Sequence, residues 1–421
     1  MFKKHLLKNG VRLITIPLKD VKSVMVLALI KTGSKYETKG INGVSHFLEH
    51  MMFKGTKKRP TTLALSTELD SVGAEYNAFT GDERTGYWVK VDCNHLDLAL
   101  DVVSDVLLNS KLDKKEIERE RGVIIEEINM NSDSPMRYIW DLFQDLMYGD
   151  QPAGRPITGT KETVAGLKRD DFLDYLKKQY IAKNLIVAVA GNFNDKNILP
   201  RIKKYFIKVK LGAPREKQKT VEHQIHPECS VFFKETEQTH FVLGVRAYSV
   251  FDKRKYALSL LSSILGGSMS SRLWISIRRK GLAYYVSSIV DATSDVGFLA
   301  ARAGVNNAKA EEVIKEVLKE FKKIRGKGVS AAELKKAKDY FKGKTLINLE
   351  GPEDWVDFAG EQEIALEKVL TPEEILEKIN AVSRQDILEV ARDIFRPEKL
   401  NLAIIGPHKG KAKFEKLLKL W

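Results

Sequence analysis

The chain repeats one pattern of helix and strand at a separation of about half its length. The segment that begins at Arg169 runs through a helical stretch into an apolar strand at 184–191, which ends in glycine. The segment that begins 215 residues later, at Arg384, runs in the same way into 399–406, which also ends in glycine. In a chain of 421 residues, duplication of one domain is the simplest explanation of such a repeat.

Both halves also begin with strand-like segments, at 10–16 and 24–30 in the first and at 230–233 and 240–245 in the second. Helical and strand patterns are interspersed, which predicts α+β domains with a sheet covered by helices. Gly212, Pro214 and a basic polar run have the composition of an exposed linker. The predicted boundaries are therefore 1–213 for the first domain, 214–226 for the linker and 227–421 for the second domain.

Residues 46–50 read His-Phe-Leu-Glu-His. On a helix, His46 and His50 are four positions apart and project from one face. Two such imidazoles can bind one Zn²⁺, whose open site takes three protein ligands and water. Glu49 lies beside them and can act as a general base toward water that the metal activates. This order of residues is the inverzincin signature.

The residues around this motif favour a buried helix. Asn42 or Ser45 can cap its N-terminus, and the apolar residues 51–53 follow it directly. The alternative interpretation is a pair of surface histidines on an amphipathic helix. A rigid metal site needs a helix packed into a core, and the apolar flank favours that arrangement.

A third ligand is expected on the segment 113–128, whose isoleucines recur at helical spacing. Glu120 and Glu127 are two helical turns apart and share one face. Composition alone does not choose between Glu126 and Glu127 as the ligand. An ordinary solvated carboxylate remains the alternative interpretation of Glu120.

These features together resemble the pitrilysin, insulinase and mitochondrial processing peptidase family of zinc peptidases. In that family 76 residues separate the motif from a glutamate ligand, and this spacing from His50 leads to Glu127. The resemblance implies one Zn²⁺ per chain, held by His46, His50 and Glu127, with Glu49 as the base. Glu120 matches a second family glutamate, which does not bind the metal itself but orients the residues that do.

Two further segments of the first half resemble the same family. Lys54-Gly55-Thr56 follows the motif as in the processing-peptidase branch, and residues 73–80 resemble a substrate-binding edge strand. Such a strand pairs with an extended peptide, so Asn77 and Ala78 become candidate substrate contacts. Without the resemblance, 73–80 is an ordinary hairpin edge bracketed by glycines.

The second half contains no H-x-x-E-H and is therefore not a second active site. Its segments 266–273 and 280–284 resemble a family signature in which an arginine and a tyrosine approach the substrate. Arg278 and Tyr284 are the candidates here. The family's arginine usually lies seven residues before its tyrosine, whereas Arg278 lies six before Tyr284 and seven before Tyr285. A helix-end arginine and a core tyrosine are the alternative.

The resemblance also implies a fold and a function. The fold is α+β, with two duplicated domains of like topology, each a mostly antiparallel sheet flanked by helices. The function is a zinc endopeptidase for peptides or unfolded segments, enclosed in a dimeric clamshell as a homodimer or as a heterodimer with a related chain. The rival is a non-catalytic scaffold subunit of the same superfamily, but such subunits lose the zinc ligands that this chain retains.

Composition excludes several other classes. The net charge of +14 invites a nucleic-acid interpretation, but the basic residues are scattered among acidic ones and no nucleic-acid motif is present. The basic run 409–421 is expected to be a docked terminal helix rather than a membrane or partner contact. Two cysteines make no disulfide framework. We see no signal peptide and no apolar run long enough for a membrane span, so a cytoplasmic protein is expected.

Overall fold

The computed structural model describes residues 2–418, which group into two compact units. The first unit comprises the chain up to Asn129, then Pro156–Gln218 and Ile347–Leu370. The second comprises Met130–Arg155, Lys219–Leu346 and the chain from Thr371 onward. The division at Gln218 falls within the predicted linker 214–226. Each unit, however, also takes a segment from the other half of the sequence, which the predicted boundaries do not contain.

Each unit is built on one sheet. The first sheet contains β1 (Lys3–Leu6), β2 (Arg12–Pro17), β3 (Ser23–Ile30), β4 (Glu75–Thr80), β5 (Thr85–Asp92) and β6 (Leu185–Gly191). The second contains β7 (Glu228–Phe233), β8 (Gln238–Arg246), β9 (Ala283–Ala292), β10 (Gly297–Asn306) and β11 (Leu400–Gly406).

The two sheets share one topology. The spatial order is β1-β2-β6-β3-β5-β4 in the first and β7-β11-β8-β10-β9 in the second, so β2–β6 correspond in chain order to β7–β11. The pairs β2/β6 and β7/β11 are parallel, and every other neighbouring pair is antiparallel. The predicted α+β fold with two like, mostly antiparallel domains is confirmed.

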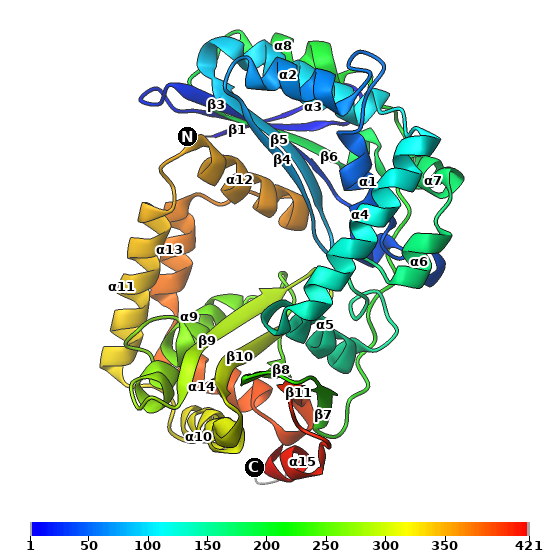
Figure 1. Ribbon diagram of the computed structural model, residues 1–421. Helices are drawn as coiled ribbons and strands as arrows, with labels where there is room; N and C mark the ends of the chain where they lie inside the picture. Colours follow the sequence, from blue (N-terminus) through cyan, green and yellow to red (C-terminus); the bar gives the residue numbers. More distant parts are fainter. Residues whose placement is uncertain (1, 419–421) are drawn as a thin grey trace. The chain divides into compact units, whose positions relative to one another are not determined.

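Helices cover both faces of each sheet (Figure 1). The first unit contains α1 (Val44–Met52), α2 (Thr62–Asp70), α3 (Leu96–Asn109), most of α4 (Lys114–Asp133), α6 (Lys161–Gly166), α7 (Arg169–Gln179), α8 (Ile198–Phe206) and α12 (Pro352–Leu366). The second contains α5 (Pro135–Tyr148), α9 (Lys255–Gly266), α10 (Ala310–Lys327), α11 (Ala331–Ile347), α13 (Pro372–Ala381), α14 (Arg384–Ile394) and α15 (Ala412–Leu418).

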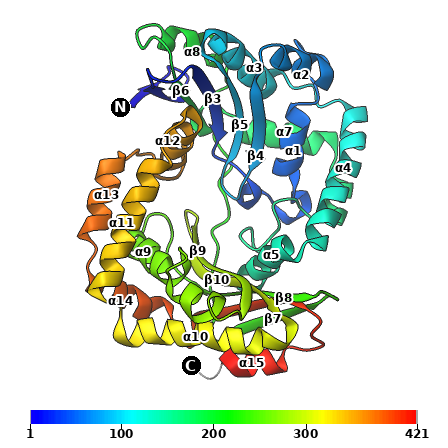
Figure 2. The same cartoon turned by 60° about the vertical axis from the view of Figure 1, so that its left-hand side comes forward.

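The segments taken from the opposite half each supply a helix that closes the core. In the first unit α12 packs on β3 and β6, and in the second α5 packs on β8 and β11 (Figure 2). In both contacts a glycine lets the helix and the sheet approach closely. A Cβ on Gly360 of α12 would lie 2.5 Å from Leu29 Cδ1, and one on Gly244 of β8 would lie 2.6 Å from Phe143 Cζ. The sheet face under α12 or α5 is therefore covered only because a distant stretch of sequence returns to it.

An ion pair fixes α12 on the first sheet. Glu363 is buried, and its carboxylate pairs with Arg12 at 3.3 Å and with Lys4 at 2.5 Å. Arg12 also donates to the backbone carbonyl of Glu363 at 3.2 Å. If α12 moved away, the buried carboxylate of Glu363 would lose these partners and remain as an uncompensated charge. The pairing therefore favours the observed position of α12 on the sheet.

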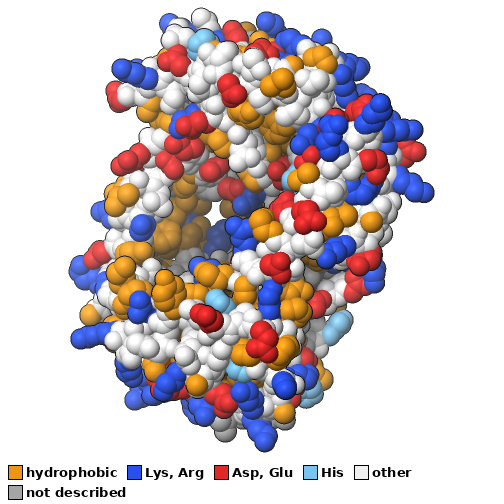
Figure 3. Space-filling view, viewed as in Figure 1, with side chains coloured by type: hydrophobic (Ala, Val, Ile, Leu, Met, Phe, Trp, Pro, Cys, Tyr) orange, Lys and Arg blue, Asp and Glu red, His pale blue; other side chains and the backbone are white. Residues whose placement is uncertain are grey.

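On the face of the molecule shown in Figure 3, basic and acidic side chains are intermixed, as expected for solvated helix faces. The start of the run 409–421 forms α15, which buries Phe414, Leu417 and Leu418; residues 419–421 lie outside the described part of the chain. Within residues 2–418, we find no helix that combines the length and apolar character needed to span a bilayer.

Candidate metal centre

The helix that carries the H-x-x-E-H motif begins after a glycine, and a side chain that is not part of the helix caps its N-terminus. Gly43 precedes α1 with φ of +94°, and a Cβ there would lie 2.7 Å from the carbonyl oxygen of Thr158. The expected caps Asn42 and Ser45 do not cap the helix through their side chains. The buried carboxylate of Glu37 does so instead, accepting from Gly43 N at 2.7 Å and from Ser45 N at 2.8 Å. These bonds satisfy N–H groups at the helix start that have no partner within the helix.

A small core joins α1 to α4. Phe47, Leu48 and Met51 on α1 pack with Ile117 and Ile124 on α4, all of them buried. The two isoleucines are two turns apart, so they form one stripe along α4. Because this stripe is buried against α1, the carboxylates of Glu120 and Glu127 on α4 lie next to the two histidines.

The structure brings together the three predicted ligands. Glu127 Oε1 lies 3.6 Å from His46 Nε2, and Glu127 Oε2 lies 3.5 Å from His50 Nε2. The three ligand atoms all lie within 4.8 Å of one another. Donors about 2 Å from a tetrahedral zinc stand roughly 3.3 Å apart, so the cluster fits this ion. Glu126 is exposed on another face of α4, which removes the ambiguity left by composition.

The histidines differ in their protonation. Burial, together with the nearby His50, lowers the pKa of His46 to about 3, so this imidazole stays neutral and free to bind a metal. Burial opposes protonation of His50 too. The hydrogen bond to Glu120 and the surrounding carboxylates outweigh it, and they raise the pKa of His50.

Glu120 lies behind His50. Its Oε1 is 2.9 Å from His50 Nδ1, and its Oε2 is 2.7 Å from Lys54 Nζ. Glu120 is 4 % exposed, which excludes the solvated interpretation. Burial would raise the pKa of Glu120, but the bonds from His50 and Lys54 lower it overall, so the carboxylate is ionised. A carboxylate on the second ring nitrogen fixes which nitrogen of His50 is available to a metal.

Glu49 lies between the ligands and the sheet edge. Its Oε2 accepts a hydrogen bond of 2.8 Å from Thr80 Oγ1, at the end of β4. Burial raises the pKa of Glu49, and the bond from Thr80 offsets this only in part. A carboxylate whose pKa is raised toward neutrality is suited to general-base chemistry.

The strand that carries Asn77 and Ala78 is a sheet edge next to α1. Among the described residues 2–418, β4 pairs with β5 alone and is the last strand in the order. Asn77 is exposed, and its Oδ1 accepts from the backbone N–H of Ala78 at 2.8 Å. The expected edge strand is therefore present, with one of its amides bonded to a side chain rather than to another strand.

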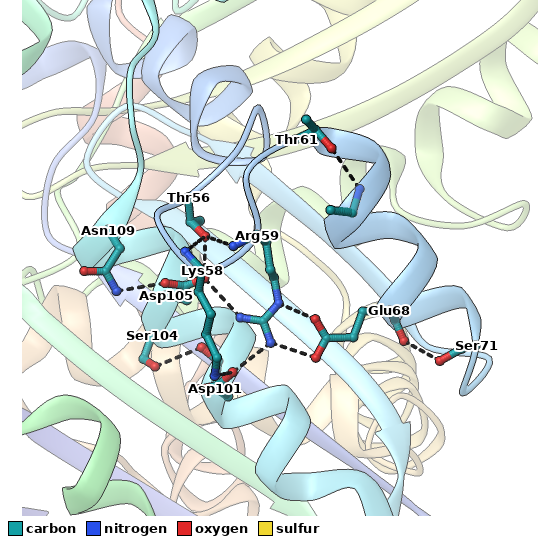
Figure 4. A network of polar contacts seen from close by, with 11 residues as sticks. Thr56, Lys58, Arg59, Thr61, Glu68, Ser71, Asp101, Ser104, Asp105 and Asn109 are labelled. Carbon is teal, nitrogen blue, oxygen red and sulfur yellow. Dashed lines mark hydrogen bonds and ion pairs between the residues drawn. The ribbon is translucent and has the colours of Figure 1, made fainter.

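The loop after α1 is held by a buried arginine (Figure 4). Arg59 donates two hydrogen bonds to Glu68, at 2.6 and 2.9 Å, and further ones to Asp101 at 2.7 Å and Asp105 at 3.0 Å. Thr56 also donates to Asp105, at 2.5 Å. These bonds tie the loop and α2 to α3. They therefore hold in place the segment that follows Lys54, next to the candidate metal ligands.

Arg278 and Tyr284 belong to the other compact unit. Arg278 ends a π-helical turn at Trp274–Arg278 and lies over the Trp274 ring at 5.7 Å. Tyr284 is 72 % exposed, so it is not a core residue. Tyr285 is half-buried, and its hydroxyl lies 3.0 Å from His240 Nδ1. Of the two tyrosines, Tyr284 is the exposed one, and within residues 2–418 its hydroxyl makes no hydrogen bond.

Two residues of this site were not predicted from the sequence. Glu37 is eight residues from Ser45, outside the range of local capping patterns. Thr80 was part of a resembling segment, but its partner Glu49 is 31 residues away along the chain. Each contact depends on how a loop or strand returns to α1, so no local pattern signals it.

Comparison with protein families places the chain among known proteins. Residues 13–161 match the insulinase model of peptidase family M16, and residues 166–341 match the model of the M16 inactive domain. The chain is 35 % identical over 411 residues to YmxG of Bacillus subtilis, named an uncharacterized zinc protease, covering 97 % of this chain and 98 % of that protein. A Rickettsia felis protein of the same description is 36 % identical over 404 residues, covering 96 % and 97 %.

Solved structures show the same fold. A protease from Helicobacter pylori superimposes with a TM-score of 0.91 at 25 % identity, covering 97 % of this chain and 99 % of that one. A chain of complex III2 from Candida albicans, at 16 % identity and a TM-score of 0.86, covers 99 % of each. The family matches, the identity along nearly the whole chain and the shared fold establish that this chain belongs to the insulinase family, peptidase family M16.

Proposed function

We propose that this chain is a zinc endopeptidase that cuts peptides or unfolded segments. The observation that carries the proposal is the cluster of His46, His50 and Glu127, with Glu49 beside it. The names of the relatives as zinc proteases support it. Zinc held by the three ligands, one ion per chain, would polarise the scissile carbonyl and acidify the attacking water.

In this mechanism the protein residues orient groups and move one proton. Glu49 takes the proton of the attacking water and then delivers it to the leaving amine. Glu120 engages Nδ1 of His50 and so leaves Nε2 as the ring nitrogen that would bind the metal. The neutral state of His46 leaves its ring nitrogen available as a ligand.

The substrate would lie as an added strand along β4. Pairing there requires the Ala78 amide to exchange its bond to Asn77 for one to the peptide backbone. Arg278 and Tyr284 would hold the peptide carbonyl and the developing oxyanion. We further propose that the working form is a dimer, either of this chain or with a related one, that encloses the substrate in a chamber.

A Glu49→Gln variant tests the assigned base. We expect it to bind zinc as the wild type does and to lose peptide cleavage, because an amide cannot accept the proton. The assay uses a fluorogenic peptide library with zinc measured on the same sample. Undiminished turnover would reject Glu49 as the base.

A matched pair on α4 tests the metal site. Glu127→Gln should abolish stoichiometric zinc binding, whereas Glu126→Gln, at the next and exposed position, should leave it intact. Metal analysis also distinguishes the rival function. A purified wild-type chain that takes up no zinc would support the non-catalytic scaffold instead.

A further inference from the structure

The carboxylate of Glu49 has two oxygens in different environments. Oε2 is engaged by the Thr80 hydroxyl at 2.8 Å, whereas across residues 2–418 no hydrogen bond reaches Oε1. A carboxylate held at one oxygen is restricted in rotation, and its second oxygen is left for another donor. An attacking water is such a donor in the proposed reaction.

Thr80 is well placed to hold that oxygen rigidly. It is the last residue of β4 and lies opposite Thr85 in the ladder with β5. Alternation along the strand places Thr80 on the same sheet face as Tyr76 and Ala78, which pack on the side of α1 and α3. A β-branched side chain on a paired strand has few rotamers, so the hydroxyl has little freedom to leave Glu49.

The same residue belongs to the edge on which a peptide would pair. Asn77 and Ala78 lie three and two positions before Thr80, respectively, on one short strand. A shift of β4 on pairing with a peptide would therefore move the hydroxyl that holds Glu49. Edge strand and base are connected through this one hydrogen bond.

We infer that Thr80 is a positioning residue for Glu49, turning one oxygen of the base toward the attacking water and linking its orientation to the strand that binds substrate. The inference rests on the proposed function. Within residues 2–418 the Thr80 hydroxyl bonds to Glu49 and makes no hydrogen bond to His46, His50 or Glu127, so its effect on catalysis passes through Glu49.

The test is an isosteric exchange, Thr80→Val, which removes the hydroxyl and keeps the branched shape. We expect kcat to fall at least about tenfold, the size of one lost hydrogen bond to a charged group, with KM and zinc content unchanged. Thr80→Ser restores a hydroxyl and should recover most of kcat. Thr85→Val is the matched control: it removes the hydroxyl directly opposite, which donates to the Thr32 carbonyl and not to Glu49.

Several outcomes would overturn the inference. Wild-type kcat in Thr80→Val shows that Glu49 needs no such support. An equal fall of kcat in Thr85→Val, or loss of zinc with activity in Thr80→Val, shows a merely structural role. A cycle with Glu49→Asp adds a second check, since the shorter carboxylate withdraws from the hydroxyl and Thr80→Val should then cost little more. A wild-type chain without zinc or cleavage fails the proposed function itself, which distinguishes the two failures.

Discussion

Glu37 accepts hydrogen bonds from both the backbone N–H and the hydroxyl of Ser45, at the start of the helix that carries the histidines. Asn42 and the backbone of Gly43 donate to its other oxygen, at 2.9 and 2.7 Å. Tyr175 of α7 contacts the same Ser45 hydroxyl at 3.1 Å. The position of α1 thus depends on one buried carboxylate and the groups gathered around it.

Glu37 should make stability depend on pH. Burial raises the pKa of Glu37 to about 7, and the bonds from Ser45, Gly43 and Asn42 lower it only in part. Because this value lies above the ordinary 4.5, protonation favours the folded state, and that contribution is lost as pH rises through 7. From about pH 5 to 8, the unfolding free energy of the wild type should fall by roughly 3 kcal/mol relative to Glu37→Gln.

Urea unfolding of both proteins across this pH range measures the difference. Glu126→Gln, which alters an exposed carboxylate, is the control and should follow the wild type. Parallel curves for Glu37→Gln and the wild type would show that Glu37 titrates normally.

Glu120→Gln should weaken zinc binding without abolishing it. The amide no longer supplies a charged partner to His50 Nδ1 and Lys54 Nζ, so the ligand ring is less firmly oriented. Loss of such a group typically costs roughly 10- to 100-fold in metal affinity. Competition with a chromogenic chelator measures it. Glu116→Gln, one turn earlier on α4, should retain full affinity, and an unchanged affinity in Glu120→Gln would exclude its role as an orienting group.

Arg59→Met should destabilise the first unit strongly. The guanidinium is 3 % exposed and forms ion pairs with three carboxylates, which the substitution would leave without their cation. Breaking a buried ion pair costs about 3–5 kcal/mol. Thermal unfolding measures the loss. Arg119→Met removes an exposed pair with Glu116 and should leave the transition where it is; equal effects of the two substitutions would contradict a structural role for the network.

A fragment of residues 1–226 should fail to fold on its own. It lacks α12, so the face of the first sheet formed by Ile14, Leu27 and Ile186 would be uncovered. Each buried aliphatic side chain contributes about 1.5–3 kcal/mol, and domains are stable by only about 5–15 kcal/mol. Solubility and circular dichroism are the measurements. Addition of a 347–370 peptide should restore folded structure, and a fragment that folds without it would show that α12 is dispensable.

The sequence by itself determined the duplicated α+β fold and the identity of the metal-site candidates. The repeat at half the chain length indicates the duplication, and helical spacing places His46 with His50 and Glu120 with Glu127 on shared faces. The choice of Glu127 over Glu126 came from the resemblance to the peptidase family, not from spacing. Covalent spacing alone decides which side chains share a helix face.

Only the tertiary structure decided which helices complete each core and which groups hold the site. The exchange of α5 and α12, the cap from Glu37 and the bond between Thr80 and Glu49 all join residues that no periodic pattern relates. The physical reason is that burial of apolar surface is non-directional. It brings distant segments together wherever their shapes fit, and hydrogen bonds then select partners among the groups that happen to meet.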